Sequence, residues 1–236
     1  MKILKLKWDS IFFGFKIAMI KGDSIEASEM NDCIKYCKKN NIRLLQFKSN
    51  FLKKDNINLA EKYKFKLVDL RIIFQKKNLK KNTINKNINL ASNNDINELK
   101  ELSKNLFNFS RYYYDKNFDK NKINEFYQDW LTKSINGKFD DGVLIYRKFK
   151  KILGFLSFRF SKNHGVISLI GTNKKYRREG IATKLVNTLE NKLVIKKIDF
   201  IKVTTQGRNL PAQNFYQKKK FTTFKIEAYY HLWLKN

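Results

Sequence analysis

The feature of this sequence that most constrains its fold is a strand-like run joined through a glycine turn to an amphipathic helix. The run is "GVISLIG" at residues 165–171, and the turn is "YRREG" at residues 176–180. After the turn, Ile181, Leu185 and Leu189 recur at steps of four, which gives the helix one apolar face. A strand that leads through a short turn into a helix is typical of proteins with a mixed α/β sheet.

Strand-like runs and amphipathic helices recur along the chain, and their distribution divides it into three parts. Residues 1–78 predict a smaller α/β domain, in which residues 12–22, "FFGFKIAMIKG", form the first strand. Residues 79–90 are polar and weakly periodic, which indicates a linker. Residues 91–236 predict two helices, three antiparallel strands, and then helix, strand, helix, strand. The expected fold class is α/β, with a mixed, mostly antiparallel sheet flanked by helices.

The net charge of the chain limits its possible partners less than the magnitude of that charge suggests. Lys and Arg number 50 against 21 Asp and Glu, a formal net charge of +29, and such an excess favours anionic partners such as nucleic acid. The basic residues are spread over nearly every segment, however, which indicates a compositional bias. A small polyanionic ligand fits the excess equally well, and we expect no nucleic-acid partner.

Cysteine, histidine and apolar runs bear on metals and location. Cys33 and Cys37 lie in one predicted helix, and His164 and His231 are distant in sequence, so we expect no metal site and reduced thiols. Asp9 interrupts the amino-terminal apolar run, which disfavours a signal peptide. No apolar stretch reaches the length of a membrane span. We therefore expect a cytoplasmic protein without an integral membrane segment.

The glycine turn is a candidate phosphate-binding site. Backbone N–H groups at the start of a helix have no intrahelical partner, and the helix dipole favours an anion there. Gly180 and Ala182 leave room for a phosphate to approach this backbone. The alternative is an ordinary helix start with solvated arginines.

Residues downstream of the turn make the pattern more specific. Arg177, Gly180 and Ala182 in "RREGIA" are followed by Asn209 and Tyr216 in "NLPAQNFYQKKKF". In this order and spacing, the two motifs resemble the acyl-CoA-binding core of the GNAT superfamily of N-acetyltransferases. The resemblance covers the predicted carboxyl-terminal domain.

The resemblance implies acetyl-CoA as the acyl donor and suggests which residues contact it. The strand end at Ile170, Gly171 and Thr172 would offer backbone N–H groups to the thioester and the pantetheine arm. Asn209 would hydrogen-bond this arm, and Tyr216 would be the general acid for the departing thiolate. The pyrophosphate would be held by the turn and the first residues of the helix: Arg177, Arg178, Glu179, Gly180, Ile181, Ala182 and Thr183.

Segments outside this core bear on the acceptor. The stretches "WDSIFFGF", "FSRYYYD" and "EFYQDW" resemble the acetyltransferases that act on nucleotide-linked 4-amino-4,6-dideoxy sugars, such as the TDP-fucosamine acetyltransferases. The resemblance implies direct transfer of acetyl to the amine of a dTDP-linked amino sugar in surface-polysaccharide synthesis. It also implies that this small-molecule substrate lies between the two domains.

Three residues are candidates on the acceptor side. We expect Arg111 and Tyr112 to contact the substrate, since a guanidinium can bind phosphate through two hydrogen bonds. The alternative is a surface arginine beside core aromatics. The resemblance suggests Asp69 as the catalytic base, and partial burial would raise its pKa toward a value suited to proton removal. The alternative is that Asp69 only pairs with Arg71, two residues on.

Other functions stay open at this point. The same fold and cofactor could serve a protein amino terminus or a small-molecule amine, although basic and aromatic acceptor-side segments disfavour a polyamine. A third hypothesis is a basic nucleic-acid-binding module on an inactive scaffold, but such a module would not need Gly180, Asn209 or Tyr216. The last strand, rich in tyrosine and leucine, suggests a homodimer formed by pairing across a subunit edge.

Overall fold

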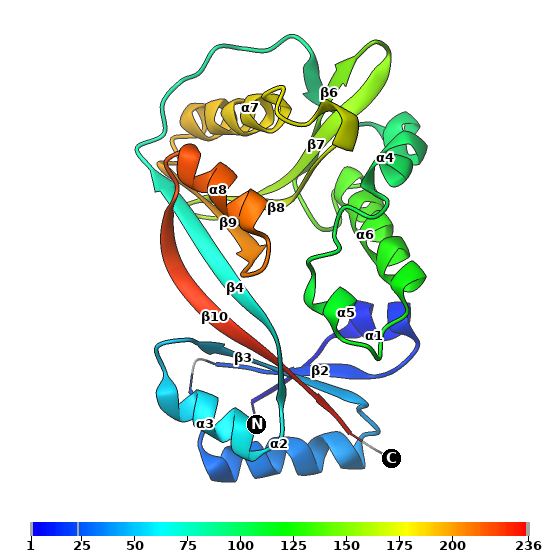
Figure 1. The fold of residues 1–236 in the computed structure, drawn as a ribbon, viewed down its shortest axis with the longest axis vertical. Coiled ribbons are helices and arrows are strands. Elements are labelled where there is room, and N and C mark those ends of the chain that lie inside the picture. Colours follow the sequence, from blue (N-terminus) through cyan, green and yellow to red (C-terminus); the bar gives the residue numbers. More distant parts are fainter. Residues whose placement is uncertain (1, 23, 235–236) are drawn as a thin grey trace.

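One sheet of ten strands runs through the computed structural model, which describes residues 2–22 and 24–234 (Figure 1). The strands are β1 (Ile3–Lys5), β2 (Ile17–Ile20), β3 (Leu44–Asn50), β4 (Lys66–Lys77), β5 (Ile88–Leu90), β6 (Gly142–Lys148), β7 (Lys151–Phe160), β8 (Gly165–Thr172), β9 (Phe200–Gln206) and β10 (Thr222–Trp233). The helices are α1 (Lys7–Phe13), α2 (Ala27–Lys39), α3 (Lys54–Lys62), α4 (Ile96–Ser103), α5 (Arg111–Tyr114), α6 (Lys120–Ile135), α7 (Ile181–Ile195) and α8 (Leu210–Lys218), with 3₁₀ turns η1 (Asn93–Asp95) and η2 (Lys174–Tyr176).

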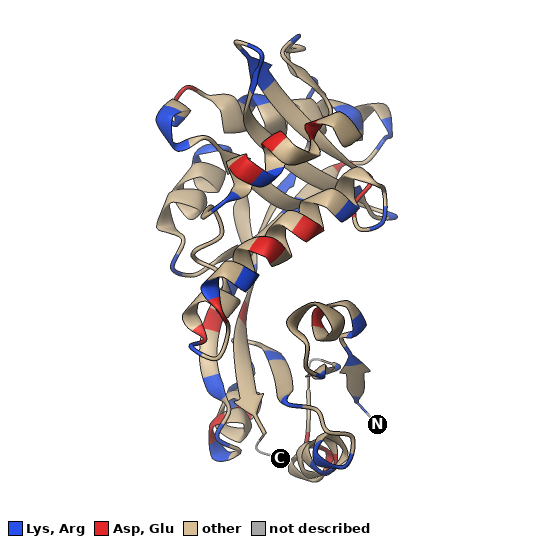
Figure 2. Cartoon of the chain, turned by 90° about the vertical axis from the view of Figure 1, so that its right-hand side faces the viewer, with Lys and Arg blue, Asp and Glu red and all other residues tan. Residues whose placement is uncertain are grey.

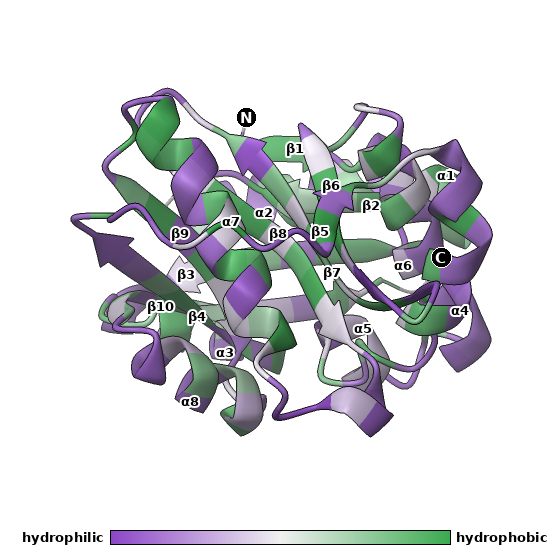
Figure 3. Ribbon diagram, turned by 90° about the horizontal axis from the view of Figure 1, so that it is seen from above, coloured by the Kyte–Doolittle hydropathy of each residue, from purple (hydrophilic) through white to green (hydrophobic). Residues whose placement is uncertain are grey.

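The sheet confirms the expected fold class. Its strand order is β1-β2-β3-β10-β4-β9-β8-β7-β6-β5, and only the pairs β2/β3 and β8/β9 are parallel. Helix α7 covers one face of strands β6 to β9, and α4 and α6 cover the other. Viewed from above, apolar residues gather on the sheet and on the helix faces toward it (Figure 3). Leu185 and Leu189 of the predicted apolar helix face are fully buried, and truncating such a leucine to alanine typically costs about 2–5 kcal/mol.

The two ends of the chain interleave in the middle of the sheet. Strand β10 lies between β3 and β4, and β4 lies between β10 and β9 (Figure 1). The sheet is therefore continuous across the predicted linker. The expectation that the last strand pairs across a subunit edge is wrong, because both edges of β10 are paired within the chain. Pairing of the last strand across a subunit edge was the argument for a homodimer, and that argument no longer holds.

The interleaved strands belong to two units that have the same order of strands and helices. One unit is β2-α2-β3-α3-β4 and the other is β8-α7-β9-α8-β10; each holds one parallel strand pair and receives the last strand of the other. Their first helices begin differently. A capping box of two carboxylates, Glu26 and Glu29, closes the start of α2, whereas α7 starts after Gly180 with no side-chain cap. Only the second of these two helix starts is open to an anion.

Two local predictions differ from the structure. The strand predicted at residues 12–22 begins only at Ile17, because Phe12 and Phe13 end helix α1, where they pack among aromatic rings. Gly14, at φ 77°, closes that helix in the left-handed conformation. The end of the predicted linker also differs, since Ile88–Leu90 forms the edge strand β5 against β6.

Basic residues are spread over elements at both ends of the molecule (Figure 2). Neither end of the ribbon carries them to the exclusion of the other in this view, and acidic residues lie among them. The distribution agrees with the compositional bias inferred from the sequence.

Candidate active site

The candidate site begins where the parallel strands β8 and β9 separate. Their ladder runs from Gly165↔Ile201 to Ile167↔Val203, and both strands continue beyond it. At the same point β8 carries an extra residue opposite β7, because the register jumps from Ile167 to Leu169 and leaves Ser168 as a bulge. Separated strands leave backbone N–H and C=O groups for a ligand.

A cavity of about 210 Å³ occupies this separation. Its lining includes four of the residues that the sequence suggested, Ile170, Asn209, Tyr216 and Arg111. Residues of β8 and β9 form much of the rest, together with aromatic side chains of α6 and of the segment before α5. A larger and more open hollow of about 450 Å³ lies over α1, α4 and α6 and contains none of the predicted site residues.

Helix α8 positions two cavity residues through their spacing. Asn209 caps this helix by accepting a hydrogen bond from the Ala212 N–H at 3.3 Å, and Tyr216 lies seven residues later, two turns along. Tyr216 is 2% exposed and packs against Phe74 and Phe221. Burial raises the pKa of its phenol, so the hydroxyl keeps its proton at neutral pH, as a general acid requires.

The start of α7 offers a free backbone. The first bond inside the helix runs from the Lys184 N–H to the Gly180 carbonyl at 2.9 Å, so the preceding N–H groups have no intrahelical acceptor. Gly180 has φ 76°, and a Cβ built on it would approach nothing closer than Lys184 Cε at 4.0 Å. Open space therefore lies in front of this backbone. Arg177 to Gly180 are exposed, and Arg178 has φ 67°.

Gly171 has a packing reason for being glycine that the sequence did not reveal. A Cβ at this position would lie 2.7 Å from both Leu106 Cδ1 and Phe155 Cε1. Gly171 and Thr172 follow Ile170 along β8 and lie outside the cavity lining. Their contact with a cofactor stays a prediction.

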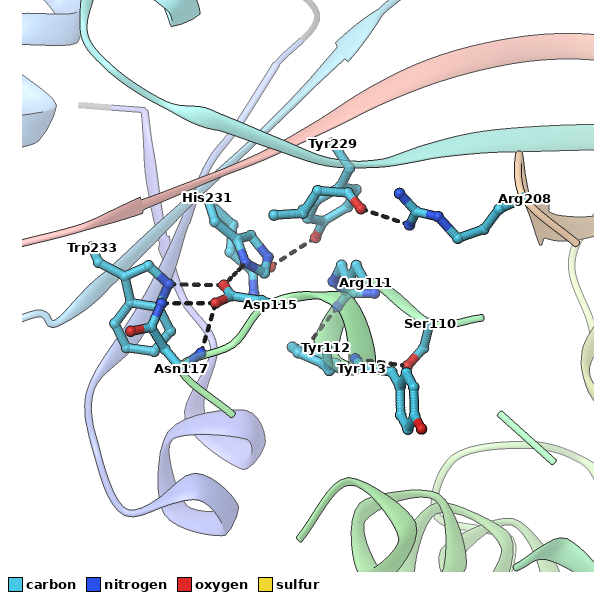
Figure 4. Close-up of polar contacts among 12 residues, drawn as sticks. Ser110, Arg111, Tyr112, Tyr113, Asp115, Asn117, Arg208, Tyr229, His231 and Trp233 are labelled. Carbon is cyan, nitrogen blue, oxygen red and sulfur yellow. Dashed lines mark hydrogen bonds and ion pairs between the residues drawn. The ribbon is translucent and has the colours of Figure 1, made fainter. Parts of the chain in front are cut away.

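Arg111 reaches the cavity from the short helix α5, and Tyr112 lies behind it. Tyr112 is 1% exposed; its hydroxyl donates to Asp9 Oδ1 and accepts from Arg111 Nη2, both at 2.7 Å. The Arg111 guanidinium lies over the rings of Tyr112 and Tyr229, 4.2 and 4.6 Å from their centroids (Figure 4). Tyr112 is not in the cavity lining and supports Arg111 from the core, so its contact with substrate stays a prediction.

Asp69 is buried among arginines beside the cavity. It is 3% exposed, and burial raises the pKa of its carboxyl to about 6, although Arg208, Arg111 and Arg71 oppose this rise. Its ion-pair partner is Arg208, at 3.5 Å, whereas Arg71 pairs with Glu227 at 3.6 Å. The alternative that Asp69 only pairs with Arg71 is wrong. Asp69 is absent from the cavity lining, while Arg71 and Arg111 belong to it.

Sequence reasoning missed a carboxylate that fixes α5. Asp115 Oδ2 contacts His231 Nδ1 at 2.6 Å and accepts from Trp233 Nε1 at 2.8 Å, and its Oδ1 accepts from Asn117 Nδ2 (Figure 4). Burial raises the pKa of Asp115, but the hydrogen bonds from His231, Trp233 and Asn117 outweigh it and lower the pKa to about 2. The ionised carboxylate thus ties the helix that carries Arg111 to β10. A histidine inside the apolar strand "AYYHLWL" was the only signal in the sequence.

The cysteines are free, buried thiols of α2, and burial raises the pKa of Cys37 to about 12. Within residues 2–22 and 24–234, no group of three or more His, Cys, Asp or Glu could hold a metal ion. None of the helices described there is long and apolar enough to cross a membrane.

Comparison with known proteins decides the family. Residues 101–221, which hold α5 to α8 and the whole strand separation, match the Acetyltransferase (GNAT) family. The chain belongs to this acetyltransferase family. GNAT acetyltransferases use acetyl-CoA as acyl donor, and the open start of α7 and the gap between β8 and β9 fit such a donor.

This GNAT chain is also similar to a curated bacterial protein over part of its length. The spore coat polysaccharide biosynthesis protein SpsD of Bacillus subtilis is 24% identical over 139 residues, which are 59% of this chain and 48% of SpsD. The chain thus spans about half the length of this curated relative.

Solved structures show the same fold over nearly all of the chain. A GCN5-related N-acetyltransferase from Sphaerobacter thermophilus has a TM-score of 0.65 at 9% identity and covers 94% of this chain and 73% of its own. A tandem GNAT protein from the clavulanic acid biosynthesis pathway has a TM-score of 0.63 at 8% identity, and the match covers 93% of this chain and 76% of that protein. A conserved protein of unknown function from Staphylococcus epidermidis has a TM-score of 0.67 at 13% identity, and the match covers 92% of this chain and 84% of that protein.

Proposed function

We propose that this protein transfers acetyl from acetyl-CoA to the amino group of a nucleotide-linked amino-dideoxy sugar of the dTDP-4-amino-4,6-dideoxyhexose type. The transfer is direct and serves surface-polysaccharide biosynthesis in the cytoplasm. The observation that carries the proposal is the cavity at the β8/β9 separation, which has the acid Tyr216 in its lining and Arg71 and Arg111 beside aromatic rings. The name of SpsD, a polysaccharide biosynthesis protein, supports the choice of a sugar.

The donor side rests on α7 and β8. The free N–H groups after Gly180 suit a pyrophosphate, and the edge of β8 toward β9, which is unpaired beyond Ile167, suits the amide groups of a pantetheine arm. Asn209 lies beside this path in the cavity lining. Acetyl-CoA supplies a thioester whose carbonyl carbon the amine attacks.

The acceptor side rests on both parts of the chain. Strand β4, from the predicted amino-terminal domain, brings Arg71, and α5 brings Arg111, whose guanidinium contacts the rings of Tyr112 and Tyr229. Guanidinium groups bind phosphate oxygens in pairs, and a nucleotide-linked sugar carries two phosphates. Arginines at this wall disfavour a polyamine, because like charges repel.

The proton balance of the reaction assigns roles to two side chains. The amine must lose a proton, and the leaving thiolate must gain one. Tyr216 keeps its proton at neutral pH and donates it to the sulfur. Asp69, with a pKa of about 6, is ionised at neutral pH and takes the amine proton through intervening water, since it lies outside the cavity lining.

Free-thiol release from acetyl-CoA tests the proposal. The panel is a set of TDP- and UDP-linked 3-amino and 4-amino dideoxy sugars, with a polyamine and a peptide amino terminus as other amines. We expect release with a nucleotide amino sugar and its loss in Tyr216→Phe. Thiol release only with a peptide or a polyamine would contradict the proposed acceptor. Tight, salt-sensitive binding of duplex nucleic acid without any thiol release would favour the nucleic-acid hypothesis.

A further inference from the structure

A buried carboxylate lies directly behind the cavity wall, at a position that no sequence motif indicated. Asp140, in the loop between α6 and β6, is 4% exposed. Its Oδ1 accepts a hydrogen bond from Ser168 Oγ at 2.5 Å, and its Oδ2 accepts from Ser134 Oγ at 2.7 Å and Trp130 Nε1 at 3.4 Å. Ser168 and Trp130 line the cavity, whereas Ser134 does not.

Among the described residues, the Asp140 carboxylate is hydrogen-bonded by neutral groups alone. Across residues 2–22 and 24–234, no basic side chain forms an ion pair with it, although the chain holds 50 Lys and Arg. A buried carboxylate is costly unless it is hydrogen-bonded or paired with an opposite charge, and here neutral donors hold it. A positively charged ligand group in the cavity would add a charged partner.

Ser168 is placed to connect this carboxylate with a ligand. It is the bulge residue of β8, at the point where β8 leaves β9. Its hydroxyl hydrogen is committed to Asp140, so only lone pairs of Oγ remain for a group in the cavity. An N–H donor suits this oxygen, and a second acceptor does not.

The opposite side of the cavity carries positive charge. Arg71 stands on β4, and Ser168 stands on β8, with β9 between them in the sheet. Because β8 and β9 have already separated at Ser168, these positions lie farther apart than two paired-strand spacings, which span about 10 Å. Arg111 lies with Arg71 in the lining. The cavity therefore has a cationic and an anionic side, which fixes the direction of a ligand with one amine and two phosphates.

We propose that Ser168 and Asp140 hold the acceptor amine. Ser168 Oγ accepts a hydrogen bond from the amine, and the Asp140 carboxylate stabilises the positive charge on nitrogen, both on binding and during attack on the acetyl carbonyl. The phosphates then lie toward Arg71 and Arg111, and the amine proton reaches Asp69, which lies beside these arginines, only through water in the cavity. This orientation rests on the proposed function and adds the residues that recognise its amine.

The test compares a nucleotide 4-amino sugar with the same nucleotide sugar carrying a hydroxyl in place of the amine. Binding of each is measured by calorimetry with CoA present, so that no transfer occurs. We expect the wild type to prefer the amino sugar by about tenfold to a hundredfold, as hydrogen bonds to charged groups do. Asp140→Asn keeps the shape and the acceptor for Ser168 but removes the charge, so the preference falls toward parity.

Two further variants sharpen the result. Ser168→Ala removes the contact and weakens amino-sugar binding about tenfold. Ser134→Ala also removes a hydrogen bond to Asp140 but does not touch the cavity, and it keeps the wild-type preference. Wild-type preference and affinity in both Asp140→Asn and Ser168→Ala would overturn the inference, and Ser168→Ala decides alone if Asp140→Asn does not fold.

The outcome is separable from that of the proposed function. If thiol release occurs with another amine and with no nucleotide sugar, the proposed function fails, and the same comparison is made with that amine and its hydroxyl analogue. If release occurs with a nucleotide amino sugar but Asp140→Asn and Ser168→Ala both keep the wild-type preference and affinity, only this inference fails. Absence of release with every amine would overturn both.

Discussion

Replacing Asp69 by asparagine separates the effect of this buried charge on folding stability from its role in catalysis. The substitution keeps the shape of the side chain and removes its charge. Burial raises the pKa of Asp69 from an ordinary 3.8 to about 6, with Arg208, Arg111 and Arg71 opposing the rise. Because Asp69 is 3% exposed, solvent screens this effect little.

The sign of the stability effect follows from the protons bound in each state. Below a pH of about 4, Asp69 is protonated in both the folded and the unfolded chain, and it costs nothing. Between about pH 4 and 6 the folded chain holds more protons than the unfolded one, so the free energy of unfolding falls as pH rises. The pKa difference between 3.8 and about 6 corresponds to about 3 kcal/mol at roughly 1.36 kcal/mol per pH unit, lost fully above pH 6.

Thermal unfolding of the wild type and Asp69→Asn at two pH values is the assay. At about pH 7.5 we expect the variant to be about 3 kcal/mol more stable, a melting temperature about 6–12 °C higher for a chain of this size, and at about pH 4 we expect the curves to converge. Turnover of the variant should fall and lose its inflection near pH 6. A melting temperature equal to or below that of the wild type at neutral pH would show that Asp69 ionises normally, and an unchanged pH profile of turnover would remove it as the base.

Three further predictions address other parts of the site. Gly180→Val should abolish acetyl-CoA binding in calorimetry, because φ 76° strains a branched side chain that also fills the space before the backbone, whereas Arg178→Gln should weaken it only modestly; equal losses would mean that the charges are the site. Tyr216→Phe should lower kcat by roughly two orders of magnitude with acetyl-CoA affinity unchanged, and near-normal turnover would exclude its role as acid. Asp115→Asn should loosen α5 and raise the acceptor KM about tenfold while the affinity for acetyl-CoA stays constant; an unchanged KM would show that Arg111 does not depend on this carboxylate.

Local features of the site could be predicted from the sequence. The run at residues 165–171, the turn at Gly180 and the apolar helix face after it follow from short-range patterns, and the structure places all three where the sequence did. The seven-residue spacing of Asn209 and Tyr216 likewise brings both to one cavity, because it corresponds to two helical turns.

Long-range pairings could not be predicted, because no local pattern records them. Asp69 pairs with Arg208, 139 positions later, since β4 and β9 are neighbours only after β4 enters the second unit. Asp115 likewise meets His231 across the sheet. The last two residues of α1, Phe12 and Phe13, were assigned to a strand because short aromatic runs fit either element, and packing against a ring of α6 decides between them.

The rate of free-thiol release with a dTDP-linked 4-amino-4,6-dideoxy sugar tests the central claim most directly. We predict saturable release with this acceptor, none with the matching hydroxyl sugar, and loss of release in Tyr216→Phe. The contradicting result is silence across all TDP- and UDP-linked 3-amino and 4-amino sugars under conditions in which calorimetry shows that acetyl-CoA binds.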